Sequence, residues 1–362
     1  MAYTTIDNPE AYFQTILYTG ASGTNPRSHT LPADTDMQPD FIWLKQRNAT
    51  QFHVLTDSAR GAGKMVISNN DDGEATNSNS GYISAFNSDG FTTTNGTSNE
   101  LYVNTTGSTY VGWCWKAGTT SGITTNGSTD ITPSAYSFNQ TSGFSIVDYN
   151  GNETAGAELA HGLGAVPHFM MFKRTDGSAS WIVYHHKNTS APETDNLVLS
   201  STAATEDSET RWNDTAPDSV NVALGSTTYI NKNGSPHVGY IFSEKQGYSK
   251  FGSYTATQNS NGPYIHLGFR AAWIMVKRTS TSGKGWIIFD NKRLGYNVDN
   301  EQIEANSDGA EYANHYIDIC ANGFKFRDDN QDVNNPSGGT YIYAAFAEAP
   351  FVNSNGVPCN AR

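Results

Sequence analysis

Cysteine, charge and long apolar runs are all scarce in this chain of 362 residues. The three cysteines are an odd number without CxxC spacing, so they indicate neither a disulfide framework nor a zinc site. No window approaches the roughly 18 to 20 apolar residues that span a bilayer, and the N-terminal residues lack the basic and then apolar layout of a signal peptide. We therefore expect a protein that is made in the cytoplasm without membrane insertion.

The low charge also bears on the partners. Charged residues make up 16% of the chain and the formal net charge is −13, whereas binding to a phosphate backbone requires clustered lysine and arginine. Nucleic acid is therefore excluded as an expected partner. A composition with 12% aromatic residues, 34 glycines and many Asn, Ser and Thr differs from that of disordered chains and is typical of β-sheets joined by polar loops.

Motifs of catalysis and of cofactor binding are missing as well. There is no GxSxG elbow, no P-loop and no GxGxxG after a strand. The adjacent acids Glu206 and Asp207 do not provide the two separated carboxyl groups that a glycosidase needs. We expect no catalytic residue, no cofactor and no enzymatic activity.

What the chain does contain is a three-fold internal repeat. Four apolar residues closed by a lysine occur three times, at residues 41–45, 169–173 and 273–277. Each run is too short for an isolated helix and too continuous for a half-exposed strand. It therefore predicts a central strand that is covered on both faces.

Two further strands accompany each lysine. A second strand is predicted at residues 53–57, 181–185 and 286–290, and a closing strand at residues 110–115, 237–242 and 341–346. The lysines lie 65, 64 and 64 residues before the start of their closing strands. A fixed period of this kind is the signature of a repeat architecture.

These patterns predict a mostly β fold of three repeated β-sandwich or jelly-roll-like modules. Three units divide the chain into lengths of about the common domain size. The text after Ala117 has no apolar periodicity and is typical of a linker. The expected division is a first module at 1–118, a linker at 119–135, a second module at 136–246 and a third at 247–362, which ends in a C-terminal strap.

The repeated lysines are Lys45, Lys173 and Lys277. A buried lysine can be tuned for catalysis, but recurrence in three modules favours an architectural role, in which the side-chain stem covers the end of a sheet.

Two kinds of metal site are conceivable. The acidic loops at 71–74 and 328–332 offer the oxygen ligands that calcium prefers, but neither follows the EF-hand pattern and solvated turns are the favoured interpretation. His185 and His186, with His161 and His168 nearby in sequence, could form a metal cluster. Because His185 falls at the repeat position of Asp57 and Asp290, a polar strand end is favoured, and we expect no metal.

Several phrases together resemble a known family. They are AYFQTILYTG, QPDFIWLKQR, HVLTDSARG, FNSDGF, YVGWCWKAG, GYSKFGSYT and YIYAAFAEAPFV. As a set they resemble virion-associated proteins of bacteriophages that infect marine bacteria, such as cyanophages, and the HGLG phrase before Pro167 is similar to segments of phage tail-fibre proteins. The resemblance covers nearly the whole chain and brings no catalytic residues with it.

The resemblance implies a structural protein of the virion, made in the host cytoplasm. The expected role is a surface-exposed tail fibre or knob that contributes to host attachment. Its expected partners are other virion proteins, further copies of the chain in a homo-oligomer, with a trimer favoured, and a host surface glycan or receptor. A capsid decoration, as a head fibre or cement protein, is the alternative, and a tailspike-like enzyme that degrades polysaccharide is a further one.

Receptor contact is expected where an exposed aromatic ring lies among polar groups on a loop. The segment at 205–219 fits best, because Trp212 lies beside Arg211 and Asp214 without an apolar period that would bury it. The competing and favoured interpretation is that Trp212 caps its own module or packs against a neighbour.

Overall fold

The computed structural model describes residues 3–295, 297, 299–330 and 332–359. Its strands are antiparallel, and the helical elements among these residues are the short η1 (Pro9–Ala11), η2 (Pro192–Thr194) and α1 (Glu209–Trp212). The predicted mostly β class is confirmed.

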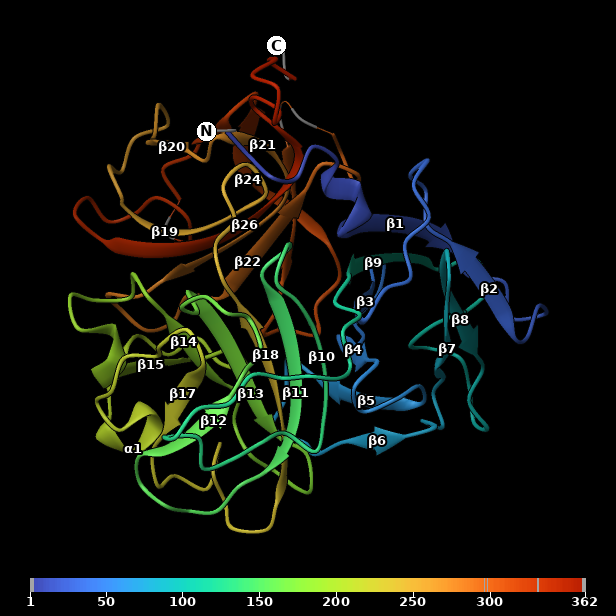
Figure 1. Ribbon diagram of the computed structural model, residues 1–362. Helices are drawn as coiled ribbons and strands as arrows, with labels where there is room; N and C mark the ends of the chain where they lie inside the picture. The colour runs from blue at the N-terminus through green and yellow to red at the C-terminus, as the bar shows by residue number, and fades with distance from the viewer. Residues whose placement is uncertain (1–2, 296, 298, 331, 360–362) are drawn as a thin grey trace.

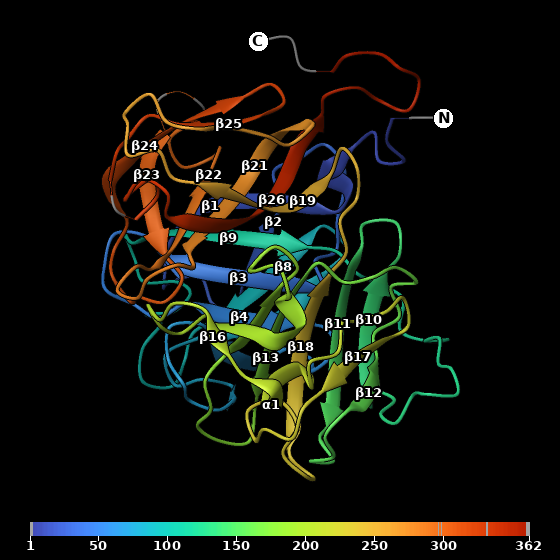
Figure 2. The same ribbon diagram turned by 90° about the vertical axis from the view of Figure 1, so that its left-hand side faces the viewer.

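The strands form three lobes around a common centre (Figures 1 and 2). We name them lobe 1 (residues 13–115, blue to teal), lobe 2 (135–242, green to yellow) and lobe 3 (249–350, orange to red). Interface I lies between lobes 1 and 2, interface II between lobes 2 and 3, and interface III between lobes 3 and 1.

Each lobe has a main sheet, and lobes 1 and 2 also have a smaller second sheet. In spatial order, the main sheet of lobe 1 has β1 (Phe13–Thr19), β9 (Thr109–Trp115), β3 (Phe41–Gln46), β4 (Val54–Asp57), β5 (Lys64–Ile67) and β6 (Ala75–Thr76), and a second sheet has β2 (Arg27–Thr30), β8 (Gly90–Thr94) and β7 (Tyr82–Asn87).

Lobe 2 has β10 (Ala135–Asn139), β11 (Phe144–Asn150), β18 (Pro236–Phe242), β13 (Phe169–Arg174), β14 (Ile182–His185), β15 (Asp195–Val198) and β16 (Glu206–Asp207), with a second sheet of β12 (Ala157–Ala160) and β17 (Asn221–Leu224). Lobe 3 has β19 (Ser249–Thr255), β26 (Thr340–Pro350), β21 (Phe269–Arg278), β22 (Trp286–Asp290), β23 (Asp299–Glu304), β24 (Tyr312–Cys320), β25 (Gly323–Phe326) and β20 (Tyr264–His266).

The same order of strands occurs in all three main sheets. An opening strand pairs with the closing strand, the closing strand pairs with the lysine strand, and two further strands follow. The register is also shared, because each lysine lies opposite an apolar residue at the same place in its closing strand. These pairs are Lys45 with Val111, Lys173 with Val238 and Lys277 with Ile342.

The lysine strands are buried on both faces, as their sequence predicted. In β3, Phe41 and Trp43 belong to a core that all three lobes share, whereas Ile42 and Leu44 belong to a core between the two sheets of lobe 1. Alternate residues of a strand point to opposite faces, so a continuous apolar run is what two apolar neighbours require.

The shared core is rich in aromatic rings where the three closing strands converge. Trp115 contacts Phe346 with 5.5 Å between ring centroids, and Phe346 contacts Phe242 at 5.6 Å. Phe41 of lobe 1 also stacks on Tyr240 of lobe 2 at 4.3 Å. Burial of these rings therefore depends on all three lobes being folded together.

We predict that Phe346→Ala lowers the free energy of unfolding by about 3–5 kcal/mol, because it removes a ring that contacts all three lobes. Chemical denaturation would measure the loss. The control is Val166→Ala, which changes a side chain that is 46% exposed and is expected to alter the free energy by less than about 0.5 kcal/mol. Equal effects of the two substitutions would contradict the shared core.

Candidate functional site at the three interfaces

Each repeated lysine is buried and links two lobes. Its ammonium group donates to a backbone carbonyl of another lobe: Lys45 to Asp308 at 3.3 Å, Lys173 to Asp71 at 2.8 Å and Lys277 to Thr202 at 3.5 Å. Each lysine also donates to a carbonyl in its own hairpin loop, at Ala49, Ala179 or Lys284. The lysine therefore joins its loop to a neighbouring lobe.

Two backbone hydrogen bonds accompany each lysine. In the first, a loop N–H donates to the same carbonyl that the lysine binds: Gln51 to Asp308 at 2.8 Å, Ala179 to Asp71 at 2.8 Å and Gly283 to Thr202 at 2.9 Å. In the second, the neighbouring lobe donates back: Glu311 to Arg47 at 2.6 Å, Glu74 to Thr175 at 2.8 Å and Thr205 to Thr279 at 3.0 Å. Lobe 1 contacts lobe 3, lobe 3 contacts lobe 2 and lobe 2 contacts lobe 1, so the lobes form a closed ring.

We call this set of one lysine and two backbone bonds the clasp. Burial lowers the pKa of Lys45, Lys173 and Lys277 from 10.5 to about 8. The hydrogen-bond partners of these ammonium groups are carbonyl oxygens. Carbonyl dipoles therefore offset only part of the cost of removing each positive charge from water.

A second set of contacts also runs around the ring. In lobe 1, Asp57 and Arg60 form a buried ion pair, and both side chains bind the hydroxyl of Tyr240 in lobe 2, at 2.7 and 3.0 Å. Burial raises the pKa of Tyr240, so its hydroxyl stays a donor to Asp57. In lobe 3, the buried pair of Asp290 and Arg293 binds lobe 1, where the indole Nε1 of Trp113 donates to Asp290 at 3.0 Å.

Interface II has different residues at the same places. Ala344 lies opposite Met275, as Tyr240 lies opposite Met171 and Trp113 opposite Trp43, so lobe 3 offers no side-chain donor there. Lobe 2 carries His185 in place of an aspartate, and its Nε2 lies 3.1 Å from the carbonyl oxygen of Tyr343. At interface II, both the residue of lobe 2 and the residue of lobe 3 that faces it therefore differ from their counterparts at interfaces I and III.

The position of His185 is explained by interface II. His185 is the last residue of β14, as Asp57 and Asp290 end β4 and β22. Burial lowers its pKa to about 3, so the ring is neutral near pH 7. Across the described residues, no three His, Cys, Asp or Glu side chains are grouped so that they could share a metal ion.

The acidic loop at 71–74 is part of interface I. The carboxylate of Asp71 accepts from the hydroxyls of Ser200 and Ser180 in lobe 2, at 2.7 and 3.0 Å, and Glu74 pairs with Arg60 at 3.0 Å. The carboxylate of Asp71 thus joins two lobes, whereas the ion pair of Glu74 lies within lobe 1. In the loop at 328–332, Gln331 lies outside the described residues.

The expectation of an exposed ring at Trp212 is corrected by the structure. Trp212 ends α1 and is 1% exposed. Its Nε1 donates to the carbonyl of Asp195 at 3.1 Å, and its ring packs on Phe172 and Tyr184. The competing interpretation, in which Trp212 caps its own module, matches this position. A helix of four residues is too short to show a period in the sequence, so the sequence carries no signal of this burial.

Arg211 and Asp214, the other two residues of the expected receptor contact, are less buried than Trp212. Arg211 lies over the ring of Tyr229 and donates to Thr227 at 2.8 Å, so it is held against the lobe. Asp214 is exposed. Receptor contact by these two residues stays a prediction, without a stacking ring beside them.

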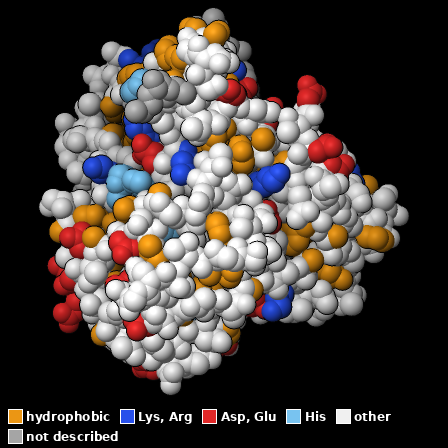
Figure 3. Space-filling model, viewed as in Figure 1, with side chains coloured by type: hydrophobic (Ala, Val, Ile, Leu, Met, Phe, Trp, Pro, Cys, Tyr) orange, Lys and Arg blue, Asp and Glu red, His pale blue; other side chains and the backbone are white. Residues whose placement is uncertain are grey.

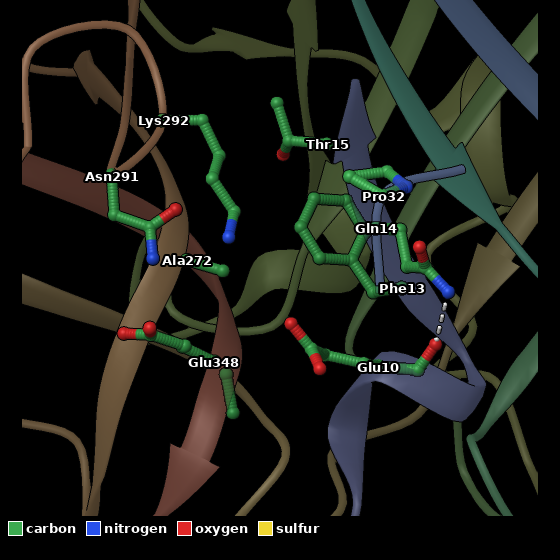
Figure 4. Close-up of a pocket in the computed structure, with 10 residues that line it drawn as sticks. Glu10, Phe13, Gln14, Thr15, Pro32, Ala272, Asn291, Lys292 and Glu348 are labelled. Carbon is green, nitrogen blue, oxygen red and sulfur yellow. Dashed lines mark hydrogen bonds between the residues drawn. The ribbon is translucent and has the colours of Figure 1, made fainter. Parts of the chain in front are cut away.

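A hollow opens at interface III (Figure 4). One wall comes from lobe 3, with Ala272, Asn291 and Glu348, and the other from lobe 1 and η1, with Phe13 and Glu10. Local sequence patterns do not reveal it, because its two walls come from opposite ends of the chain.

The face in Figure 3 carries scattered charges and small apolar areas, with histidine atoms visible where the two left-hand lobes meet. In the described part of the chain, no helix is long and apolar enough to cross a membrane.

The chain belongs to a family that is described as a domain of unknown function (DUF7483), whose model matches residues 8–350. No curated protein and no solved structure matches the chain. The matched range includes all three lobes, so the unit that the family model describes is the ring and not a single lobe.

We predict that the clasp makes stability depend on pH. The lysine pKa is 10.5 when the chain is unfolded and about 8 when Lys173 is buried, so the unfolded state binds more protons between pH 8 and 10. The free energy of unfolding of the native protein should therefore rise across this window relative to that of Lys173→Met. Urea denaturation at pH 8, 9 and 10 would measure it.

The matched control is Lys187→Met, which changes an exposed lysine of the same lobe. Its free energy of unfolding should follow that of the native protein at each pH. Parallel curves for Lys173→Met and the native protein would show that the buried ammonium group does not have the lowered pKa.

A further prediction concerns Tyr240→Phe, which leaves Asp57 and Arg60 buried without their hydroxyl partner. We expect the free energy of unfolding to fall by about 1–3 kcal/mol. Denaturation of Tyr82→Phe provides the comparison, because this half-buried tyrosine lies in β7, away from interface I. A loss no larger than that of Tyr82→Phe would mean that the hydroxyl adds nothing to the interface.

Proposed function

We propose that the protein is a structural component of a bacteriophage virion, exposed at the surface as a tail fibre or knob that contributes to host attachment. The resemblance to virion-associated proteins of marine phages supports the viral source. The observation that carries the structural role is the closed ring of three clasps, in which charged and polar groups that could do chemistry are used to join lobes.

We further propose that the three lobes are copies of one β-sandwich module. The shared strand order, the shared lysine register and the cyclic clasp contacts support this interpretation. Three similar lobes around a centre place similar surfaces around one axis, as the subunits of a trimer do. A ring of this kind could sit on the three-fold axis at the tip of a fibre.

The ring bears on the oligomeric state. The homotrimer stays a prediction, and the ring adds a competing arrangement in which one chain takes the place of three subunits. Static light scattering of the purified protein distinguishes one chain mass from three. A single chain mass would favour the competing arrangement.

Location in the particle tests the proposed function directly. Purified virions labelled with antibody against this protein and imaged by electron microscopy should carry the label at the tail. Label on the head would support the alternative, a capsid decoration, for which the compact ring is also suited. Particles that carry no label and no peptide of this protein by mass spectrometry would overturn the proposal.

The competing activity is cleavage of host polysaccharide. Incubation with surface glycans of a susceptible host should release no new reducing ends under the proposed role. Release of oligosaccharide would overturn the proposal that the protein is not an enzyme.

A further inference from the structure

A second and larger hollow opens where the connection from lobe 2 to lobe 3 passes the first residues of the chain. It has about 300 Å³ of space for water-sized molecules, which is at the lower end of the roughly 300 to 1,000 Å³ found for small-molecule sites. We call it the joint hollow. Its polar lining residues are Tyr3, Glu244, Gln246, Ser249, Lys250 and His266.

The walls of the joint hollow are held in place by hydrogen bonds. The hydroxyl of Tyr3 donates to the carbonyl of Gly268 at 2.8 Å, and the hydroxyl of Thr4 donates to the carbonyl of Gln246 at 2.7 Å. The first residues of the chain thus tie the turn after β20 to the connection between lobes 2 and 3. The hollow is therefore formed before any ligand binds, as is usual for small-molecule sites.

Positive side chains gather around the joint hollow, and Figure 3 shows lysine or arginine atoms beside histidine atoms where lobes 2 and 3 meet. Burial raises the pKa of Glu244, and the nearby charges of Lys250 and Lys187 partly offset this rise. Burial lowers the pKa of His168 to about 4, and the charges of Lys187 and Lys245 add to the effect. Three lysines thus create a positive region on a chain whose formal net charge is −13.

These three lysines have no acidic partner. Elsewhere a lysine of lobe 3 does, since Lys284 pairs with Asp332 at 3.1 Å. Within the described residues, none of the lysines around the joint hollow forms an ion pair. The carboxylate of Glu244 in the lining accepts from the backbone N–H of Phe251 at 3.3 Å. An anion in the hollow would supply the missing counter-charge.

The joint hollow also offers hydrogen-bonding groups that the fold leaves free. Lys250 donates to the carbonyl of His266 at 2.8 Å, and an ammonium group has three donors, so two remain. The hydroxyl of Ser249 accepts from the N–H of Lys245 at 3.0 Å, which leaves its own proton to donate. The side-chain amide of Gln246 is exposed and has no hydrogen-bond partner among the described residues.

An exposed aromatic ring lies next to the joint hollow. Tyr264 and His266 point to the same face of β20, because alternate residues of a strand do so. Tyr264 is 46% exposed, and its hydroxyl donates to Oδ1 of Asn322. A Cβ atom at Gly323 would lie 3.0 Å from Cζ of Tyr264, so the glycine lets the ring lie across β25. One face of the ring is thus backed by the sheet and the other is open to solvent.

We propose that the joint hollow binds a sugar residue that carries a carboxylate, and that the next sugar of the same glycan stacks on Tyr264. Lys250 pairs with the carboxylate, while Ser249 and Gln246 bind hydroxyl groups. A sugar ring has an apolar face and a rim of hydroxyls, so it uses both the aromatic surface and the polar groups. A phosphate ion would satisfy the lysines and leave Tyr264 unused.

This inference rests on the proposed role in host attachment, and it names the class of ligand and the place of contact. The test uses the full chain and three soluble probes, which are tetragalacturonate, tetramannuronate and sialyllactose. Heteronuclear NMR at millimolar probe should show, for at least one of them, shifts of the backbone N–H signals of Gly247 and Gly268, which line the hollow. The methyl ester of that probe keeps the sugar rings without the charge and should bind at least about tenfold more weakly.

Substitutions make the test specific. Lys250→Gln should weaken binding at least about tenfold, because it removes the charge that faces the carboxylate. Tyr264→Ala should weaken binding by about threefold to tenfold through loss of the stacking face. Lys292→Gln changes an exposed lysine of the same lobe and should bind the probe as the native protein does. If Lys250→Gln does not fold, Gln246→Ala takes its place, because this exposed side chain contributes little to folding and should still weaken binding.

Four outcomes contradict the inference. They are no shift with any of the three probes, equal affinity for the acid and its methyl ester, equal affinity of the native protein and Lys250→Gln, and full displacement of the probe by equimolar inorganic phosphate. The last outcome would identify a site for small anions. Label absent from virions, with probe binding intact, would instead contradict the proposed function alone, so the two proposals can fail separately.

Discussion

The clasp is the contact on which the arrangement of the lobes depends. Its lysine, the hairpin loop behind it and the carbonyl in front of it come from two lobes, so none of the three clasps can form within one lobe. Each lobe provides the lysine of one clasp and the carbonyl of another, so the contacts are heterologous. Heterologous contacts form a closed ring only when the rotation between units closes, and otherwise they continue as an open filament. Three lobes achieve this closure here, and closure is what buries the aromatic residues of the shared core.

Because the interfaces are buried, the charged residues there need partners from the neighbouring lobe. A buried ion pair adds little stability compared with apolar residues, but loss of one partner is costly. Asp57 and Arg60 are retained where lobe 2 offers the hydroxyl of Tyr240, and His185 stands where lobe 3 offers only a backbone carbonyl. The type of polar residue in one lobe thus depends on the donor or acceptor of the next. An aspartate facing Ala344 would have no side-chain donor at that position.

The sequence predicted the parts of the fold that are set by local apolar patterns. The predicted strand at 41–45 is β3 (Phe41–Gln46), and that at 237–242 lies within β18 (Pro236–Phe242). The second-layer strand β2 (Arg27–Thr30) is short and polar, so it shows no such pattern. The sequence predicted an architectural role for the lysines, in which the side-chain stem covers the end of a sheet. Their hydrogen-bond partners in the neighbouring lobes were beyond prediction, because Asp71 and Thr202 act through backbone carbonyls that any residue provides. The hollow at interface III is lined by residues from both ends of the chain, such as Phe13 and Ala272, so only the three-dimensional structure reveals it.

Interface III depends more on its own contacts than the other two interfaces do. Interfaces I and II join lobes that are linked directly by residues 116–134 and 243–248, whereas interface III brings together strands from the two ends of the chain. The entropy cost of closing a loop rises with its length. Interface III also carries an ion pair between lobes: Arg47 of lobe 1 pairs with Glu311 of lobe 3 at 2.7 Å, and Glu311 pairs with Arg293 at 3.0 Å. Arg47 stands where lobes 2 and 3 have Thr175 and Thr279, which form only the backbone part of the clasp to the neighbouring lobe. Additional attraction at the interface that joins the two ends of the chain is the expected compensation.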